Sequence, residues 1–211
     1  MQRAEAIANL LRTTPDVWSG HEVAAAQSRD SGFPALNALL PGHGWPISSL
    51  IELIPLMEGI GELQLLLPAL RPLCREGRDV VFICPPHIPY PPALANAGLP
   101  LNRIVWIDAK NDEEARWSAE QILREGIAGA ILLWSDATKD LALRRLQVAA
   151  REGESLLFLY RSATLLHSAS PATVRIALRP QAGLLHTEVI KSRGGRAAST
   201  QLQLHSVCEA A

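Results

Sequence analysis

The 211-residue sequence has little of several residue types, and each shortage excludes a class of protein. Its three cysteines form no Cys-x-x-Cys pair and have no histidine at metal-ligand spacing, which argues against a disulfide framework or a zinc site and favours reduced thiols. Aromatic residues make up only 5% of the chain, so the core is expected to be aliphatic. The net charge of −1 gives no overall field that attracts nucleic acid, so any contact with DNA is expected to be weak or indirect.

Long uncharged apolar runs are also missing. No window of about 18 apolar residues escapes a charge, and Glu5 interrupts the N-terminal segment where a signal peptide has its apolar core. We therefore expect a cytoplasmic protein with no membrane contact. With 48% hydrophobic residues, the chain can bury one full core. We expect this domain over residues 31–195, an N-terminal helix and linker arm over 1–30, and a partly flexible C-terminal tail over 196–211.

Strand and helix patterns alternate along the chain, which predicts an α/β fold with a mostly parallel central sheet. The expected strands are residues 48–54, 79–84, 103–107, 129–134 and 155–160. The expected helices are residues 60–76, 91–98, 112–125 and 138–152. Pro68 and Pro72 should break or kink the first of these helices. For the last two helices, Asn111 and Asp136 are the expected N-caps, and Gly126 and Gly153 the expected left-handed residues at the C-terminal ends.

After residue 165 the pattern changes to short alternating segments at 173–179, 185–191 and 200–204. Turns at Gln181–Gly183 and Gly194–Gly195 join them. This predicts an antiparallel C-terminal extension at one edge of the sheet.

Residues 50–64 are laid out as a strand, a glycine-containing turn and a helix start, which is the arrangement of a phosphate-binding P-loop. Gly59 and Gly61 are present, but Glu62 stands where the pattern needs lysine, and Leu63 where it needs serine or threonine. A carboxylate at this point repels a triphosphate, and a leucine offers no oxygen to magnesium. The segment is therefore interpreted as a degenerate nucleotide loop, and we expect no cofactor, no metal and no catalytic residues.

The preceding segment, residues 31–54, resembles the approach to the P-loop in RecA-type recombinases. It has a Ser-Gly opening, a Leu-Asn pair, a glycine-rich turn at residues 41–46 and a core strand that carries Glu52. The resemblance implies a RecA-like three-layer fold. Where the recombinases place a catalytic glutamate and a metal-linked aspartate, this chain has Pro86 and Trp134. The substitutions imply that the chain is not an enzyme; an NTPase with displaced catalytic residues is the alternative.

A narrower resemblance is carried by residues 41–46, 59–64, 144–150 and 191–195. These segments are similar to the family of translesion DNA synthesis-associated ImuA proteins, with the cell division inhibitor SulA as a related family. The resemblance spans residues 30–195. It implies an SOS-response adaptor that binds RecA and a Y-family polymerase-like partner of the ImuB type, and that acts indirectly with an error-prone replicative-type polymerase. A SulA-like inhibitor that binds the division protein FtsZ is the alternative.

Two aromatic residues are candidate partner contacts. Trp117 lies on the polar stripe of the helix expected at 112–125, where a large rigid side chain is suited to anchor an interface. Alternatively, another loop of the same chain covers it. Tyr90 lies in a proline run, residues 84–92, that is expected to hold it outward at the carboxyl end of a strand. Alternatively, the run is only a stiff connector.

The last candidate site is basic. Lys191, Arg193 and Arg196 surround Gly194 and Gly195 in the final predicted turn. Three cations on a glycine turn can reach phosphates or an acidic partner. The RecA comparison implies a surface that faces a neighbouring subunit, and the alternative is a solvated turn.

Overall fold

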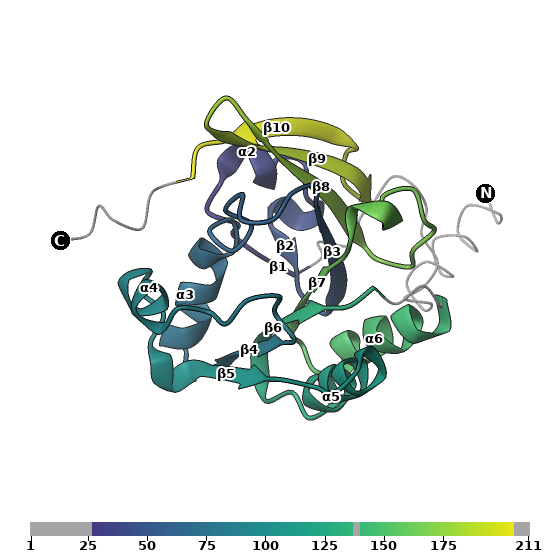
Figure 1. Cartoon of the computed structure of the whole chain (residues 1–211). Coiled ribbons are helices and arrows are strands. Elements are labelled where there is room, and N and C mark those ends of the chain that lie inside the picture. Colours follow the sequence, from purple (N-terminus) through teal and green to yellow (C-terminus); the bar gives the residue numbers. More distant parts are fainter. Residues whose placement is uncertain (1–26, 137–139, 205–211) are drawn as a thin grey trace, which may run out of the picture.

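The computed structural model describes residues 27–136 and 140–204, and its centre is an eight-stranded sheet with the order β10-β9-β8-β3-β7-β6-β4-β5 (Figure 1). The parallel strands are β3 (Ser49–Pro55), β4 (Asp79–Ile83), β5 (Ile104–Ile107), β6 (Ala128–Trp134), β7 (Leu156–Tyr160) and β8 (Val174–Gln181). Two antiparallel strands follow, β9 (Leu184–Ser192) and β10 (Ala198–Leu202). The predicted α/β class and mostly parallel sheet are confirmed.

The three predicted C-terminal strands pair antiparallel with one another, β8 with β9 and β9 with β10, and β8 joins the rest of the sheet by parallel pairing with β3. Ala182 and Gly183, both with positive φ, form the turn between β8 and β9. Strand β10 pairs with β9, so residues 198–202 of the segment expected as a tail belong to the sheet. Residues 205–211, like the segment 1–26, lie outside the described residues.

The longer helices are α3 (Leu67–Arg75), α4 (Pro91–Asn96), α5 (Asp112–Arg124) and α6 (Asp140–Glu152). Helix α3 begins seven residues later than residue 60, where the sequence predicted its start. Gly59 and Gly61 take left-handed φ values of 72° and 90°, which end any helical path through the loop. Pro68 then lies in the first turn of α3, where its missing N–H costs no hydrogen bond.

The two ends of α5 follow the prediction. The side chain of Asn111 accepts a 2.9 Å hydrogen bond from the backbone N–H of Glu114, and Gly126 has a φ of 64°. At the end of α6 the prediction was wrong, because Glu154 rather than Gly153 takes the left-handed conformation, with a φ of 49°. Gly153 meets a different need: a Cβ there would lie 1.7 Å from the carbonyl oxygen of Leu123, where α5 approaches.

Alternate residues of each central strand enter two separate cores, one on each face of the sheet. Helix α3 covers the face that receives Phe82, Leu132 and Phe158, whereas α5 and α6 cover the face that receives Ile83, Leu133 and Leu159. The sheet is therefore the middle of three layers (Figure 1).

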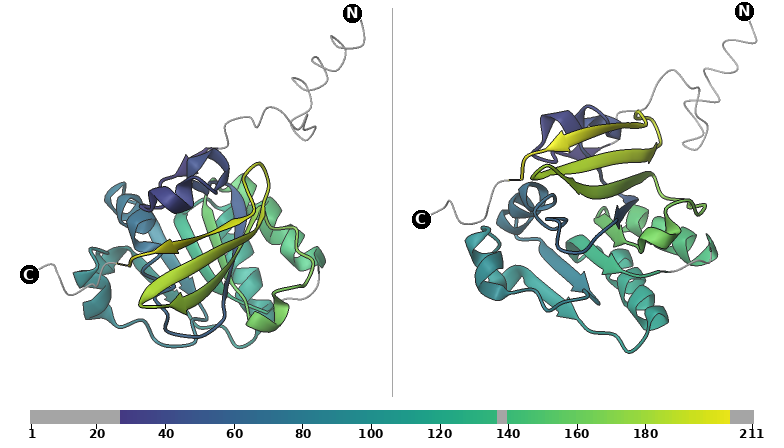
Figure 2. Two further views of the ribbon diagram at one scale, coloured as in Figure 1. Left: turned by 90° about the horizontal axis from the view of Figure 1, so that it is seen from above. Right: turned by 45° about the horizontal axis from the view of Figure 1, so that its top comes forward.

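Short elements close the molecule beside the antiparallel strands. Strands β1 (Ser28–Arg29) and β2 (Trp45–Pro46) form a small antiparallel pair, and α2 (Pro34–Asn37) lies against β10 (Figure 2). Within residues 27–136 and 140–204 there are also three short 3-10 turns: η1 (Pro41–His43), η2 (Leu101–Arg103) and η3 (Ala163–Leu165). Trp45, from the glycine-rich turn, is fully buried and packs edge-on against Phe158 at 5.3 Å between ring centroids.

Candidate functional site

A cavity of about 750 Å³ opens at the carboxyl ends of β3, β6 and β7. This is the edge at which open parallel sheets place their ligands. The wall segments are residues 55–58 with Glu62 after β3, Pro86 after β4, Asp112 at the start of α5, residues 134–136 at the end of β6, and residues 160–163 at the end of β7. We call this the edge cavity.

The loop expected to be a degenerate nucleotide loop forms one wall of the edge cavity. The backbone N–H of Gly59 donates a 3.3 Å hydrogen bond to Oε1 of Glu62, so the carboxylate folds back onto its own loop. Leu63 turns the other way and packs against the core under α3. A Cβ on Gly61 would lie 2.4 Å from Cδ1 of Leu204, so this glycine allows the end of the chain's described part to approach.

Most of the charged residues among the described residues that line the edge cavity are acidic. Four carboxylates, those of Glu58, Glu62, Asp112 and Asp136, face a single guanidinium, that of Arg161. The side chain of Arg161 is only 1% exposed and donates to Glu52, a carboxylate that it shares with Arg175. The lining therefore favours a cation over a phosphate.

Three of these four carboxylates have partners at the rim. Glu58 lies 3.4 Å from Nε2 of His87, Asp112 pairs with Arg116, and Asp136 accepts a 2.7 Å hydrogen bond from the backbone N–H of Ser162. Asp136 thus contacts the segment after β7; the start of α6 that it was expected to cap adjoins residues outside the described part of the chain.

Glu62 differs from the other three. Its Oε2 is buried and has no hydrogen-bond partner among the described residues. An unsatisfied buried acceptor costs about 1–3 kcal/mol, and more when it is charged.

The floor of the edge cavity is an aromatic stack. The ring of Trp134 lies 4.4 Å from that of Tyr160 and 6.3 Å from that of Phe82, nearly parallel to both. Tyr160 donates a 3.2 Å hydrogen bond to the backbone carbonyl of Glu62. Burial raises the pKa of Tyr160 well above its usual range, and the Glu62 carboxylate adds to the rise. Trp134, at the position compared with a metal-linked aspartate, is thus a packing residue.

Behind the cavity lies a buried ion network around Glu52, whose side chain is fully buried. Arg175 donates from Nε at 2.7 Å, Arg161 donates from a terminal nitrogen at 3.2 Å, and the hydroxyl of Ser170 also donates to this carboxylate. Arg175 further donates to the carbonyls of Leu165 and Ser168. The network joins β3 to β8 and to the segment after β7.

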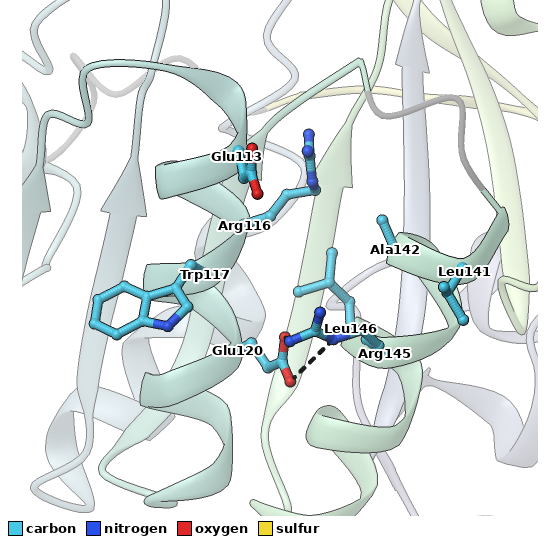
Figure 3. A pocket seen from close by; sticks show the side chains of 8 residues that line it. All are labelled: Glu113, Arg116, Trp117, Glu120, Leu141, Ala142, Arg145 and Leu146. Atoms are coloured by element: carbon cyan, nitrogen blue, oxygen red, sulfur yellow. Dashed lines mark hydrogen bonds and ion pairs between the residues drawn. The ribbon is translucent and has the colours of Figure 1, made fainter.

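A second, smaller hollow of about 260 Å³ lies between α5 and α6 (Figure 3). Glu120 bridges the two helices through a 2.8 Å ion pair with Arg145, and Arg124 pairs with the same carboxylate at 2.9 Å. Trp117, also on α5, lines the same hollow, and 58% of it is exposed. The described residues do not cover this indole. Its role in binding stays a prediction.

The other predicted contacts lie apart from the edge cavity lining. Tyr90 immediately precedes α4 and is 69% exposed, so it is held outward as expected. Lys191 belongs to β9 and donates a 2.6 Å hydrogen bond to the carbonyl of Ser170, so it is not on the turn. Arg193 lines a third hollow beside α6.

The turn that follows β9 is packed against the segment before η1. The backbone N–H of Arg196 donates to the carbonyl of Leu39, and a Cβ on Gly195 would lie 2.5 Å from the same oxygen. Gly194 has a φ of 82°. Arg193 and Arg196 are exposed beside this turn.

Sequence reasoning missed several residues that build the site. Tyr160 and Arg161 were not singled out, and Asp136 was named only as a helix N-cap, although each lies at or just after the end of a predicted parallel strand. Since carboxyl ends of parallel strands meet at one edge, that position alone was the available signal. Gln147, quoted only for its resemblance, accepts a 3.1 Å hydrogen bond from the N–H of Leu50 and so ties α6 to β3.

Within the described residues, no group of three or more histidine, cysteine, aspartate or glutamate side chains could hold a metal ion. Cys74 and Cys84 are free thiols, and burial raises the pKa of Cys74. No helix in the described ranges has the length and apolarity that crossing a bilayer requires.

Fold and site together define a mixed α/β protein with an acidic cavity at the carboxyl edge of its parallel strands. A family model described as cell division inhibitor SulA matches residues 50–157, from β3 to the first residues of β7. The match covers just over half of the chain, which therefore belongs to the SulA family.

A curated relative from Photorhabdus laumondii subsp. laumondii, named cell division inhibitor SulA, is 29% identical over 112 residues. The aligned part is 53% of this chain and 63% of the relative, so the chain spans less than two thirds of that protein's length. The narrower resemblance to ImuA is not distinguished from SulA by these matches.

Proposed function

We propose that this SulA-family chain is a non-catalytic, RecA-like adaptor of the SOS mutagenesis apparatus. In this role it binds RecA and a Y-family polymerase-like protein in the cytoplasm, and it acts on an error-prone replicative-type polymerase indirectly. The observation that carries the proposal is the acidic lining of the edge cavity, where a nucleotide-binding relative would hold phosphates. A cavity of this kind supports binding without ATP turnover.

Three features of the site support the non-catalytic part of the proposal. Glu62 turns its carboxylate onto the loop, Leu63 packs against the core, and Trp134 is held in an aromatic stack. Each of these positions would have to supply a cation or an oxygen ligand in a P-loop enzyme. An NTPase with displaced catalytic residues makes the opposite prediction: millimolar Mg-ATP would raise the unfolding temperature and be hydrolysed.

The adaptor part of the proposal rests on exposed surface. Trp117 presents a large rigid side chain on α5, and Tyr90 presents another before α4. Exposed aromatic residues are suited to become interface anchors, because they bury much apolar area with few rotatable bonds. Trp117 is the stronger candidate, since it lies beside the ion-paired hollow between α5 and α6.

The test is co-purification of the full chain with RecA and with the polymerase-like partner, each with and without ATP and at low and high salt. The adaptor proposal expects stable capture of at least one partner without ATP. Capture of neither would overturn it. A capture that persists at high salt would point to apolar anchors, whereas one lost steeply with salt would point to the exposed arginines or to bound DNA.

Division inhibition is the second candidate, and the family description and the relative's printed name favour it. In that case the chain would bind FtsZ. Expression in cells that lack the polymerase-like partner would then produce filaments. Normal division in those cells, at a protein level checked by immunoblot, would remove this candidate.

A further inference from the structure

We propose that the edge cavity is a receptor for a basic side chain, arginine or lysine, that a partner protein inserts. The inference rests on the proposed protein-binding function and deepens it, because it states the chemistry that the partner must present. A P-loop enzyme binds a negatively charged phosphate at this place, whereas this cavity would bind a positively charged side chain.

The size and composition of the cavity fit such an occupant. Its volume of about 750 Å³ lies within the range of ligand pockets, roughly 300–1,000 Å³. Met57 and Leu56 supply apolar surface and are 61% and 36% exposed. The methylene stem of an arginine or lysine can pack on this apolar surface while its charged head reaches the carboxylates.

Charge complementarity defines the head group. Glu58 and Glu62 come from the loop after β3, Asp112 from the start of α5 and Asp136 from the end of β6, so three segments supply the four carboxylates. Oε2 of Glu62 is buried and lacks a donor among the described residues, so an incoming N–H would satisfy it once the Glu62 side chain turns toward the cavity. Arg161 offsets these four charges only in part, because it is a single guanidinium and shares the Glu52 carboxylate with Arg175.

A protein-borne cation fits better than a free nucleotide for a further reason. A triphosphate would bring several negative charges next to Glu62 and Asp136, and like charges at close range in a partly buried site cost free energy. A partner's basic side chain reverses the sign of the same interaction. Because the two rim carboxylates of Glu58 and Asp112 are exposed, the attraction should weaken as salt rises.

The test uses the ¹⁵N-labelled full chain and follows the indole N–H signal of Trp134, which lines the cavity, with the signal of Trp117 as an internal reference. The probes are acetyl-Arg-Gly-Arg amide, its lysine and glutamate counterparts, and Mg-ATP. We expect the arginine or lysine peptide to give a saturable shift at Trp134 and none at Trp117. The glutamate peptide and Mg-ATP should give no shift.

A matched pair of variants locates the binding. The double variant Glu58→Gln/Glu62→Gln should raise the dissociation constant of the basic peptide at least fivefold. The control Glu113→Gln/Glu125→Gln removes the same charge from α5 and its C-cap, outside the cavity lining, and should leave the constant unchanged. Equal effects of both variants would overturn the proposal, because the peptide would then sense only net charge.

Other occupants give distinct results. A shift with Mg-ATP but not with basic peptides would make the cavity a nucleotide site and overturn the proposal. A Trp134 signal that moves with protein concentration alone would assign the cavity to a second copy of the chain, with the same consequence. No shift with any probe would overturn the receptor proposal while leaving the adaptor function to the co-purification result.

Discussion

The hydroxyl of Tyr160 donates a 3.2 Å hydrogen bond to the backbone carbonyl of Glu62, a residue 98 positions earlier in the chain. This bond fixes the loop after β3 to the end of β7. It also places the Glu62 carboxylate beside a phenol that stays neutral, since burial and this carboxylate both raise the pKa of Tyr160. The loop is thus held by packing and a hydrogen bond, with no phosphate needed to order it.

Tyr160→Phe should lower the free energy of unfolding by about 0.5–1.5 kcal/mol, the usual net value of one hydrogen bond. The ring stack with Trp134 is retained, so the fold should persist. Urea unfolding monitored by circular dichroism measures the change. Tyr90→Phe, on an exposed residue, is the control and should have little effect.

The same variant has a pH signature. Because the folded pKa of Tyr160 lies above its unfolded value, the unfolded state releases its proton first as pH rises. The stabilisation is therefore complete below about pH 10, the unfolded pKa of tyrosine, and is lost between there and the higher folded pKa. Between pH 8 and pH 11, the free energy of unfolding should fall less steeply for Tyr160→Phe than for the unchanged chain. Identical slopes would mean that Tyr160 does not couple folding to pH.

Glu52→Gln should lower the free energy of unfolding by about 3–5 kcal/mol, because it leaves two arginines in a buried site without their carboxylate. The matched control is Glu188→Gln, which breaks an exposed pair with Arg179 and should cost no more than about 1 kcal/mol. Chemical denaturation of both variants provides the comparison. A similar small loss in both would show that the buried network contributes little.

Trp117→Ala should weaken capture of a protein partner at least tenfold while leaving the unfolding temperature nearly unchanged. An exposed anchor contributes to binding rather than to the core. Trp106→Ala is a suitable control, since Trp106 is also about half exposed but lies on β5. Quantitative pull-down against RecA and the polymerase-like partner measures the effect. If the unchanged chain, Trp117→Ala and Trp106→Ala all captured the partner equally, Trp117 would not be an interface anchor.

Gly153→Ala should destabilise the fold by about 1–3 kcal/mol or more, because its Cβ would press on the Leu123 carbonyl oxygen at 1.7 Å. Gly183→Ala separates this clash from simple backbone strain. Gly183 has a φ of 79° but open space around it, so alanine there should cost only about 1–2 kcal/mol. Thermal unfolding shows which of the two variants is less stable. A larger loss of stability in Gly183→Ala than in Gly153→Ala would contradict the packing argument.

Periodicity was sufficient to predict every strand of the central sheet, because buried parallel strands are short apolar runs with clear turn signals at each end. It failed at the start of α3, where Ile60, Leu63 and Leu66 continue an apolar helical pattern that Gly59 and Gly61 prevent. It also misassigned Gly153, since the approach of α5 to α6 is a tertiary contact that no local pattern records.

The candidate site was predicted only in part. The replacement of the phosphate-binding residues was visible in the sequence, because Glu62 and Leu63 adjoin Gly61. The acidic cavity was not, since Asp112, Asp136 and Glu58 come together only when the strand ends meet. The same holds for Trp134: its position was noted as a substitution, but the stack with Tyr160 and Phe82 depends on strand order.

The ion network around Glu52 also sets an order of events during synthesis. Its two arginine partners follow it by 109 and 123 residues, so a ribosome completes β3 long before either cation exists. Until Arg175 has been synthesised, burial of β3 would place the Glu52 carboxylate in the core without enough hydrogen-bond donors. Burial of β3 is therefore most favourable once both arginines are present.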